Sequence, residues 1–80
     1  MMKARVFVTL KQSVFDPQGR TIAEALHSMG YAGVGDVRQG KVIELELGET
    51  DAATARAQVE AMCGKLLANP VIETYTIELA

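Results

Sequence analysis

Hydrophobic and polar residues alternate with a period of two at both ends of the chain. Residues 3–11, KARVFVTLK, place Ala4, Val6, Val8 and Leu10 on one side and polar or mixed residues on the other. This period is typical of a strand with one buried face. Residues 71–79, VIETYTIEL, are rich in β-branched residues and predict a last strand.

Two runs in the middle of the chain, GVGDVR (33–38) and KVIELEL (41–47), also have the pattern of strands. Gln39 and Gly40 separate them, and a glycine at the second turn position supplies the positive φ that a tight hairpin requires. The sequence therefore predicts a hairpin here. In its second strand we expect Ile43, Leu45 and Leu47 to face the core and Glu44 and Glu46 to face outward.

Two segments have helical spacing. In residues 16–30, Asp16 can cap the first turn, Pro17 suits the first helical position and Gly30 ends the helix. The apolar side of this helix is formed by Ile22, Leu26 and Met29. Residues 51–69 form the second helix, with Asp51 or Thr50 as its cap, an Asn69-Pro70 stop, and an apolar side of Ala55, Val59, Met62 and Leu66.

The resulting order, strand-helix-strand-strand-helix-strand, predicts a single α+β domain over residues 1–80. We expect a four-stranded antiparallel sheet with both helices on one face, in the ferredoxin-like order. The other face of the sheet is then bare and suited to cover by another protein surface. The residues predicted on that face are Phe7, Thr9, Val42, Ile72, Thr74 and Thr76.

The length and the net charge of the chain limit the kinds of partner that it can bind. At 80 residues and 49% hydrophobic composition the chain folds around a thin core, so homodimerisation or larger assembly is expected. A net charge of -2 and a sequence pI near 5.2 argue against nucleic acid or an anionic membrane as the main partner.

The single cysteine cannot form an internal disulfide, and no Cys/His cluster has metal-ligand spacing. A reducing compartment fits this usage best, and the sequence has neither a signal-peptide pattern nor a long apolar run. We therefore expect a cytoplasmic protein without a metal site.

Candidate catalytic residues do not combine into a site. His27 lies beside the apolar side of its helix without an assignable partner, and Cys63 stands in an apolar stretch as a structural thiol. Glu44 and Glu46 share a sheet face, as outward residues of a strand do. The sequence predicts no catalytic residue and no cofactor-binding residue in this chain.

Three motifs resemble one family. FDPQGRTIAEAL, then VRQGK, then CGKLLANPVIETYTIE stand in the order and spacing of PurS, the small subunit of phosphoribosylformylglycinamidine (FGAM) synthase. The resemblance covers nearly the whole chain. It implies a non-catalytic subunit in the fourth step of de novo purine biosynthesis, which assembles the other subunits and supports ammonia transfer.

The same resemblance implies the partners. A glutaminase subunit (PurQ-like) releases ammonia from glutamine, and a synthetase subunit (PurL-like) uses ATP and magnesium to make the amidine. The small subunit forms homodimers or higher assemblies and joins the two.

The stretch DVRQGK (36–41) permits two interpretations. In the first, Gly40 makes the turn, and Arg38 and Lys41 are solvated beside it. In the second, the same turn presents both cations to an acidic patch on a partner. We favour docking. We interpret Asp16 and Gly19 primarily as the start of a helix and only secondarily as an exposed contact with a partner.

Two other functions remain as alternatives. A small dimeric regulatory domain that binds an amino acid uses the same order of elements, but it places a glycine-rich loop directly after the first strand, which this chain lacks. An enzyme such as an acylphosphatase requires an anion loop and an asparagine, and Asn69, the only asparagine, lies at a helix end.

Overall fold

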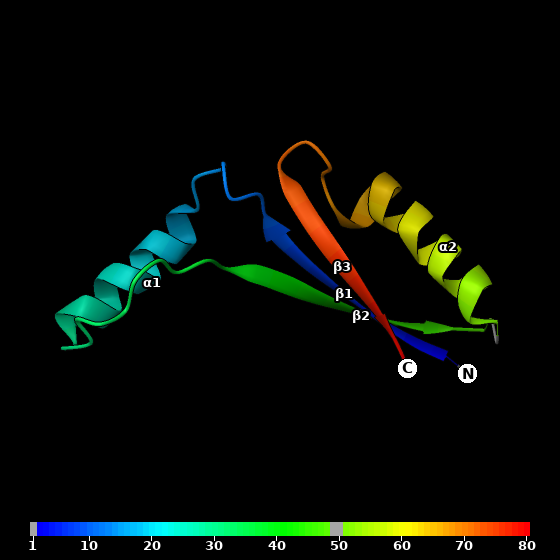
Figure 1. Cartoon of the computed structure of the whole chain (residues 1–80), viewed down its shortest axis with the longest axis horizontal. Coiled ribbons are helices and arrows are strands. Elements are labelled where there is room, and N and C mark those ends of the chain that lie inside the picture. The colour runs from blue at the N-terminus through cyan, green and yellow to red at the C-terminus, as the bar shows by residue number, and fades with distance from the viewer. Residues whose placement is uncertain (1, 49–50) are drawn as a thin grey trace.

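The computed structural model describes residues 2–48 and 51–80, so Thr50, one of the two predicted caps, lies outside the described residues. Its elements follow one another along the chain as β1 (Met2–Leu10), α1 (Pro17–Ser28), β2 (Gly40–Leu47), α2 (Ala52–Met62), the π-helical turn η1 (Cys63–Leu67) and β3 (Glu73–Leu79). The α+β class is confirmed, and Figure 1 shows the arrangement of these elements.

The sheet has β1 at its centre and antiparallel neighbours on both sides, in the order β2-β1-β3. Val6 stands opposite Ile43 of β2 and Ile77 of β3, so the apolar positions of the three strands fall on the same face. The predicted orientation of β2 is confirmed, because Leu47 is buried while Glu44 and Glu46 are exposed.

The predicted fourth strand and its hairpin are wrong. Residues 34–39 form neither helix nor strand, and Gly40 is the first residue of β2, paired with Thr9, rather than a turn residue. This segment alternates weakly and contains Gly35 and Asp36, residue types that strands disfavour. Its last backbone N–H, that of Gln39, bonds to a side chain instead of a strand.

The core lies between the sheet and α2. Ala55, Val59 and Cys63 recur every fourth residue and are completely buried against Ala4 and Val6. The remaining buried hydrophobic residues are Val8, Leu47 and Ala68.

The second helix departs from its predicted apolar side at one residue, Leu66, which is 83% exposed. The helix widens into η1, where the N–H of Ala68 bonds to the carbonyl of Cys63 at 3.1 Å. This extra residue in the turn carries Leu66 away from the core and leaves Leu67 half-buried in its place. Asp51 caps the helix by accepting a bond from the Thr54 N–H at 2.9 Å, as predicted.

Helix α1 does not lie on the sheet, so the prediction of both helices on one face is wrong. It projects beyond the end of the sheet on the left of Figure 1, and segment 29–39 runs back along it. We call residues 17–39 the arm, and the sheet with α2 and η1 the body. The ends of α1 are as predicted: Asp16 caps it, and Gly30, at φ 99°, closes it.

The arm gives the protein an elongated shape. Its extents are 48 × 25 × 14 Å and its radius of gyration is 16.0 Å, whereas a compact chain of this length has about 12 Å. Among the described residues no helix is long and apolar enough to cross a membrane.

Candidate functional site

Residues from the motifs FDPQGRTIAEAL and VRQGK meet where the arm joins the body. Asp16, at the start of α1, is only 4% exposed. Its Oδ1 accepts a hydrogen bond from the Gly19 N–H at 2.9 Å, and its Oδ2 accepts one from the Gln39 N–H at 2.7 Å. One carboxylate therefore caps the helix and also ties down the returning chain.

The electrostatics of Asp16 fit this double role. The Gln39 N–H contributes most to lowering the pKa of this carboxyl below its ordinary value, followed by the Gly19 N–H. The positive charge of Arg38 acts in the same direction, and burial opposes them. The ionised form is thus the one that holds the junction together.

Arg38 is not a solvated residue beside a turn. It is half-buried, and its Nη2 donates hydrogen bonds of 2.8 Å to the carbonyl oxygens of Lys11 and Val14. These two carbonyls belong to the loop between β1 and α1, so Arg38 fastens that loop from the opposite chain segment. Its predicted docking role remains a prediction.

Two glycines permit the close approach of these segments. A Cβ on the buried Gly19 would collide with the carbonyl oxygen of Val37, and a Cβ on Gly40 would lie 2.5 Å from the carbonyl oxygen of Val8. Both positions therefore exclude a side chain for reasons of space. We call Asp16, Gly19, Arg38, Gln39 and Gly40 the clasp. The predicted docking roles of Asp16, Gly19 and Gly40 also remain predictions.

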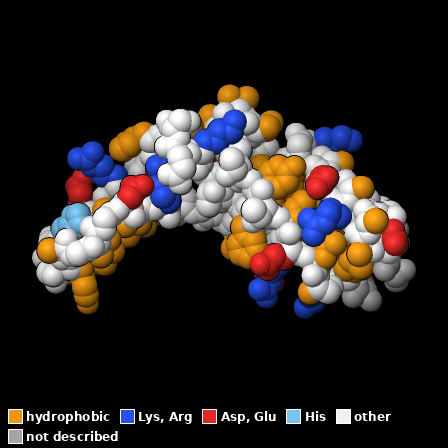
Figure 2. All heavy atoms as spheres, viewed as in Figure 1, with side chains coloured by type: hydrophobic (Ala, Val, Ile, Leu, Met, Phe, Trp, Pro, Cys, Tyr) orange, Lys and Arg blue, Asp and Glu red, His pale blue; other side chains and the backbone are white. Residues whose placement is uncertain are grey.

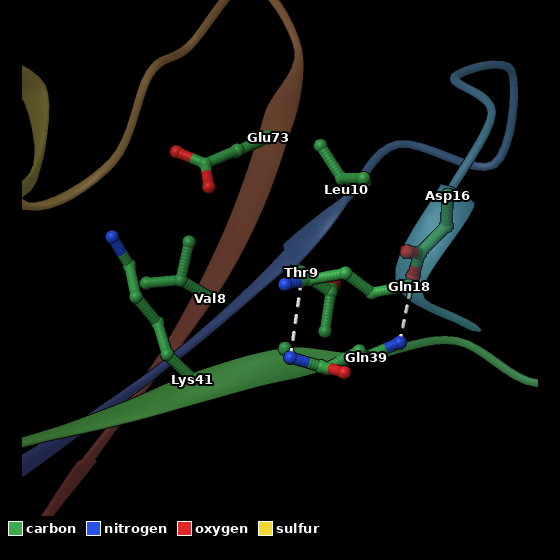
Figure 3. A pocket seen from close by; sticks show the side chains of 9 residues that line it. Val8, Thr9, Leu10, Asp16, Gln18, Gln39, Lys41 and Glu73 are labelled. Atoms are coloured by element: carbon green, nitrogen blue, oxygen red, sulfur yellow. Dashed lines mark hydrogen bonds between the residues drawn. The ribbon is translucent and has the colours of Figure 1, made fainter. Parts of the chain in front are cut away.

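A groove of about 320 Å³ opens beside the clasp, between the base of α1 and the end of the sheet. Figure 3 shows Lys41 and Glu73 on the sheet side of this groove and Gln18 and Gln39 on the arm side. The Gln39 side-chain amide donates to Gln18 Oε1 at 3.0 Å. Within the described residues the ammonium of Lys41 has no hydrogen-bond or ion-pair partner.

The candidate catalytic residues lie apart. His27 is exposed, as expected, and its Nε2 lies 2.7 Å from the carbonyl oxygen of Val34, so it also ties the returning segment to α1. Cys63 is completely buried, and burial raises the pKa of its thiol, with a smaller contribution from Glu60. Glu44 forms a salt bridge of 3.2 Å with Arg5 on the exposed sheet face. The described residues contain no cluster of three potential metal ligands.

The sheet face turned away from α2 collects the residues predicted for it. Phe7 stands opposite both Val42 and Thr76, and the hydroxyls of Thr9 and Thr74 are 3.3 Å apart. Val42 is 55% exposed. Ile72 lies in the turn that precedes β3 (Glu73–Leu79), so its predicted place on this face remains a prediction. Their role in a dimer remains a prediction.

The arm carries an apolar surface that was not predicted as such. Figure 2 shows hydrophobic side chains along the lower edge of the arm, at the left of the picture. The exposed large hydrophobic residues of the arm are Ile22, Met29 and Tyr31, and Met29 is 69% exposed.

Sequence reasoning missed Gln39 as a partner of Asp16, although chain length offers a signal. The twelve residues of α1 span about 18 Å, and six extended residues cover about 20 Å. Residues 34–39 can therefore return along the whole helix and reach its start.

Comparisons with known proteins point to the same family as the three sequence motifs. The family model described as PurS, phosphoribosylformylglycinamidine (FGAM) synthase, matches residues 3–80. The PurS subunit of this synthase from Bacillus subtilis is 51% identical over 79 residues, which are 99% of this chain and 93% of the relative.

Two solved structures are also similar. Methanocaldococcus jannaschii PurS, one of the subunits of formylglycinamide ribonucleotide amidotransferase in the purine biosynthetic pathway, superposes with a TM-score of 0.91 at 42% identity, covering 100% of this chain and 96% of the other. A chain in the structure of PurLQS from Thermotoga maritima superposes with a TM-score of 0.88 at 31% identity, covering 100% and 99%.

Proposed function

The chain belongs to the PurS family of FGAM synthase subunits, and on that premise we propose that it joins the synthetase subunit to the glutaminase subunit and supports ammonia transfer between them. The observation that carries this proposal is the similarity, over the full length of the chain, to a chain of the PurLQS structure from Thermotoga maritima. An elongated chain with an exposed apolar side on its arm and a bare sheet face suits a role in assembly.

We also propose that the chain forms a homodimer or a higher assembly. Its accessible surface is 5574 Å², whereas a compact protein of 8.6 kDa exposes about 4,700 Å². The excess of roughly 900 Å² is about what one partner contributes to a stable interface. It is supplied by the arm, whose apolar side chains have no body to cover them, and by the bare face of the sheet.

In this proposal the chemistry belongs to the partner subunits. Glutamine is bound by the glutaminase subunit, ATP and magnesium are bound by the synthetase subunit, and this chain binds none of them. The buried thiol of Cys63 supports this division, because its raised pKa disfavours the nucleophilic thiolate. We place the protein in the cytoplasm, where a free cysteine stays reduced.

Reconstitution with the synthetase and glutaminase subunits of the same organism tests the assembly function. We expect glutamine-dependent FGAM formation to require this chain, and ammonia-dependent formation by the synthetase subunit to proceed without it. Equal glutamine-dependent activity with and without the chain, at matched subunit concentrations, would refute the proposed function.

A further inference from the structure

The groove beside the clasp differs in its chemistry from the apolar side of the arm. Its floor is formed by Val8 and Leu10, and its rim carries the polar side chains of Gln18, Gln39, Lys41 and Glu73. Interfaces that form reversibly are more polar than those of permanent dimers. The groove thus has the composition of a site for a separate protein, whereas the apolar side of the arm suits a second copy of this chain.

Most charged groups near the groove are already committed. Both oxygens of Asp16 accept backbone hydrogen bonds, and Arg38 Nη2 is held by two carbonyls. Glu73 Oε1 accepts a bond of 2.7 Å from the N–H of Asn69. The exposed ammonium of Lys41 is the rim cation that has no partner among the described residues.

We infer that this groove receives an Asp or Glu side chain of a partner subunit, and that Lys41, not Arg38, is the cation that binds it. This inference rests on the proposed function. The Gln18 amide also lines the groove, and its N–H groups are further donors for a bound carboxylate. The apolar floor lowers the local exposure to water and so strengthens the ion pair.

Glu73, which lies with Lys41 on the sheet side of the groove, limits the occupant. Its carboxylate repels a second negative charge, so a segment with one acidic residue between neutral residues fits better than an acidic cluster. Attraction by Lys41 and repulsion by Glu73 therefore act together in the recognition of the partner.

The test measures binding of this chain to the synthetase and glutaminase subunits, separately and together, by calorimetry at several salt concentrations. The variants are Lys41→Glu and Lys41→Gln, with Lys65→Glu as the matched control, because Lys65 is an exposed lysine on η1 away from the groove. We expect about tenfold weaker binding for Lys41→Glu, about threefold for Lys41→Gln, and less than about twofold for Lys65→Glu. The Lys41 variants should also show a weaker dependence on salt.

Light scattering on the same variants separates the possible occupants of the groove. An unchanged homo-oligomer with weakened binding to a partner subunit supports the inference. Dissociation of the homo-oligomer by Lys41→Glu would overturn it in favour of a second copy, and unchanged binding of both Lys41 variants would overturn it altogether. If the unaltered chain bound neither subunit, the proposed function itself would fail.

Discussion

The body and the arm contain helices of similar length but differ in what holds them. In the body, α2 buries Ala55 and Val59 completely against the sheet. In the arm, α1 buries no hydrophobic side chain, and its residues Ile22 and Met29 stay exposed. The buried residue next to it is a carboxylate, Asp16.

This difference shows two ways of positioning a helix. Hydrophobic burial stabilises α2 and leaves its exact direction to side-chain packing. The clasp fixes α1 by directed hydrogen bonds and two glycine contacts at its base, and leaves its apolar side available. A helix held in this way is suited to contact another protomer, since its exposed apolar side is presented in a defined direction.

The largest expected effect comes from placing a charge in the core of the body. Val6→Asp buries a carboxylate at a position with 0% exposure and should cost more than about 4 kcal/mol, enough to unfold a domain of this size. Met29→Asp adds the same charge to the arm and should leave the circular dichroism of the protein native. A cooperative native melt for Val6→Asp would contradict the assignment of the core.

A methyl group inside the clasp should have the next largest effect. Gly19→Ala places a Cβ against the carbonyl of Val37 and should lower the free energy of unfolding by about 2 kcal/mol. Gly33→Ala is the matched control, because a Cβ there meets nothing and the φ angle is not left-handed. Urea denaturation measures both, and equal stability of the two variants would show that the clasp is not close-packed.

Acid should open the clasp while the body persists. Because the folded pKa of Asp16 lies below its ordinary value, its stabilising contribution is present at neutral pH and is lost as the pH falls below about 3.8 through the folded pKa. We expect hydrogen exchange of the Gln39 amide, relative to the intrinsic rate at each pH, to accelerate in this range.

Asp51, whose pKa is also lowered, provides an internal reference for this experiment. The Thr54 hydroxyl, and after it the Thr54 N–H, lower this pKa by stabilising the charge at the start of α2. Asp16→Asn should therefore remove the acid response at Gln39 and preserve that at Thr54. An acid response at Gln39 that survives Asp16→Asn would assign it to another group.

The smallest effect is expected at the far end of the arm. His27→Ala removes the contact between Nε2 and the Val34 carbonyl, which lies at the surface and is worth roughly 0.5 kcal/mol. Only amides of the returning segment, residues 31–36, should exchange faster, as seen by NMR. Faster exchange throughout α1 would mean that this contact, and not the clasp, holds the arm.

Local patterns predicted most of the elements. The alternation around Val6 and the spacing of Ala55 and Val59 located the body, and the residues Asp16, Gly30 and Asp51 marked helix ends where the structure has them. These features depend on neighbours within a few residues, which a sequence pattern records directly.

Three features could not be predicted from the sequence because they depend on distant or external contacts. Segment 33–38 has the residues of a weak strand, but the Asp16 carboxylate takes the N–H of Gln39, and the segment pairs with no strand. The apolar side of α1 has the same pattern whether it faces its own sheet or another molecule. The two partners of Arg38 are backbone carbonyls, and these leave no trace in residue type.

Sedimentation equilibrium of the unaltered chain at micromolar concentration tests the central claim most directly, because a clasped arm with an exposed apolar side requires a second molecule to cover it. We predict the mass of a dimer or a larger assembly, with no more than a trace of the 8.6 kDa species. A stable folded monomer at this concentration would contradict the account.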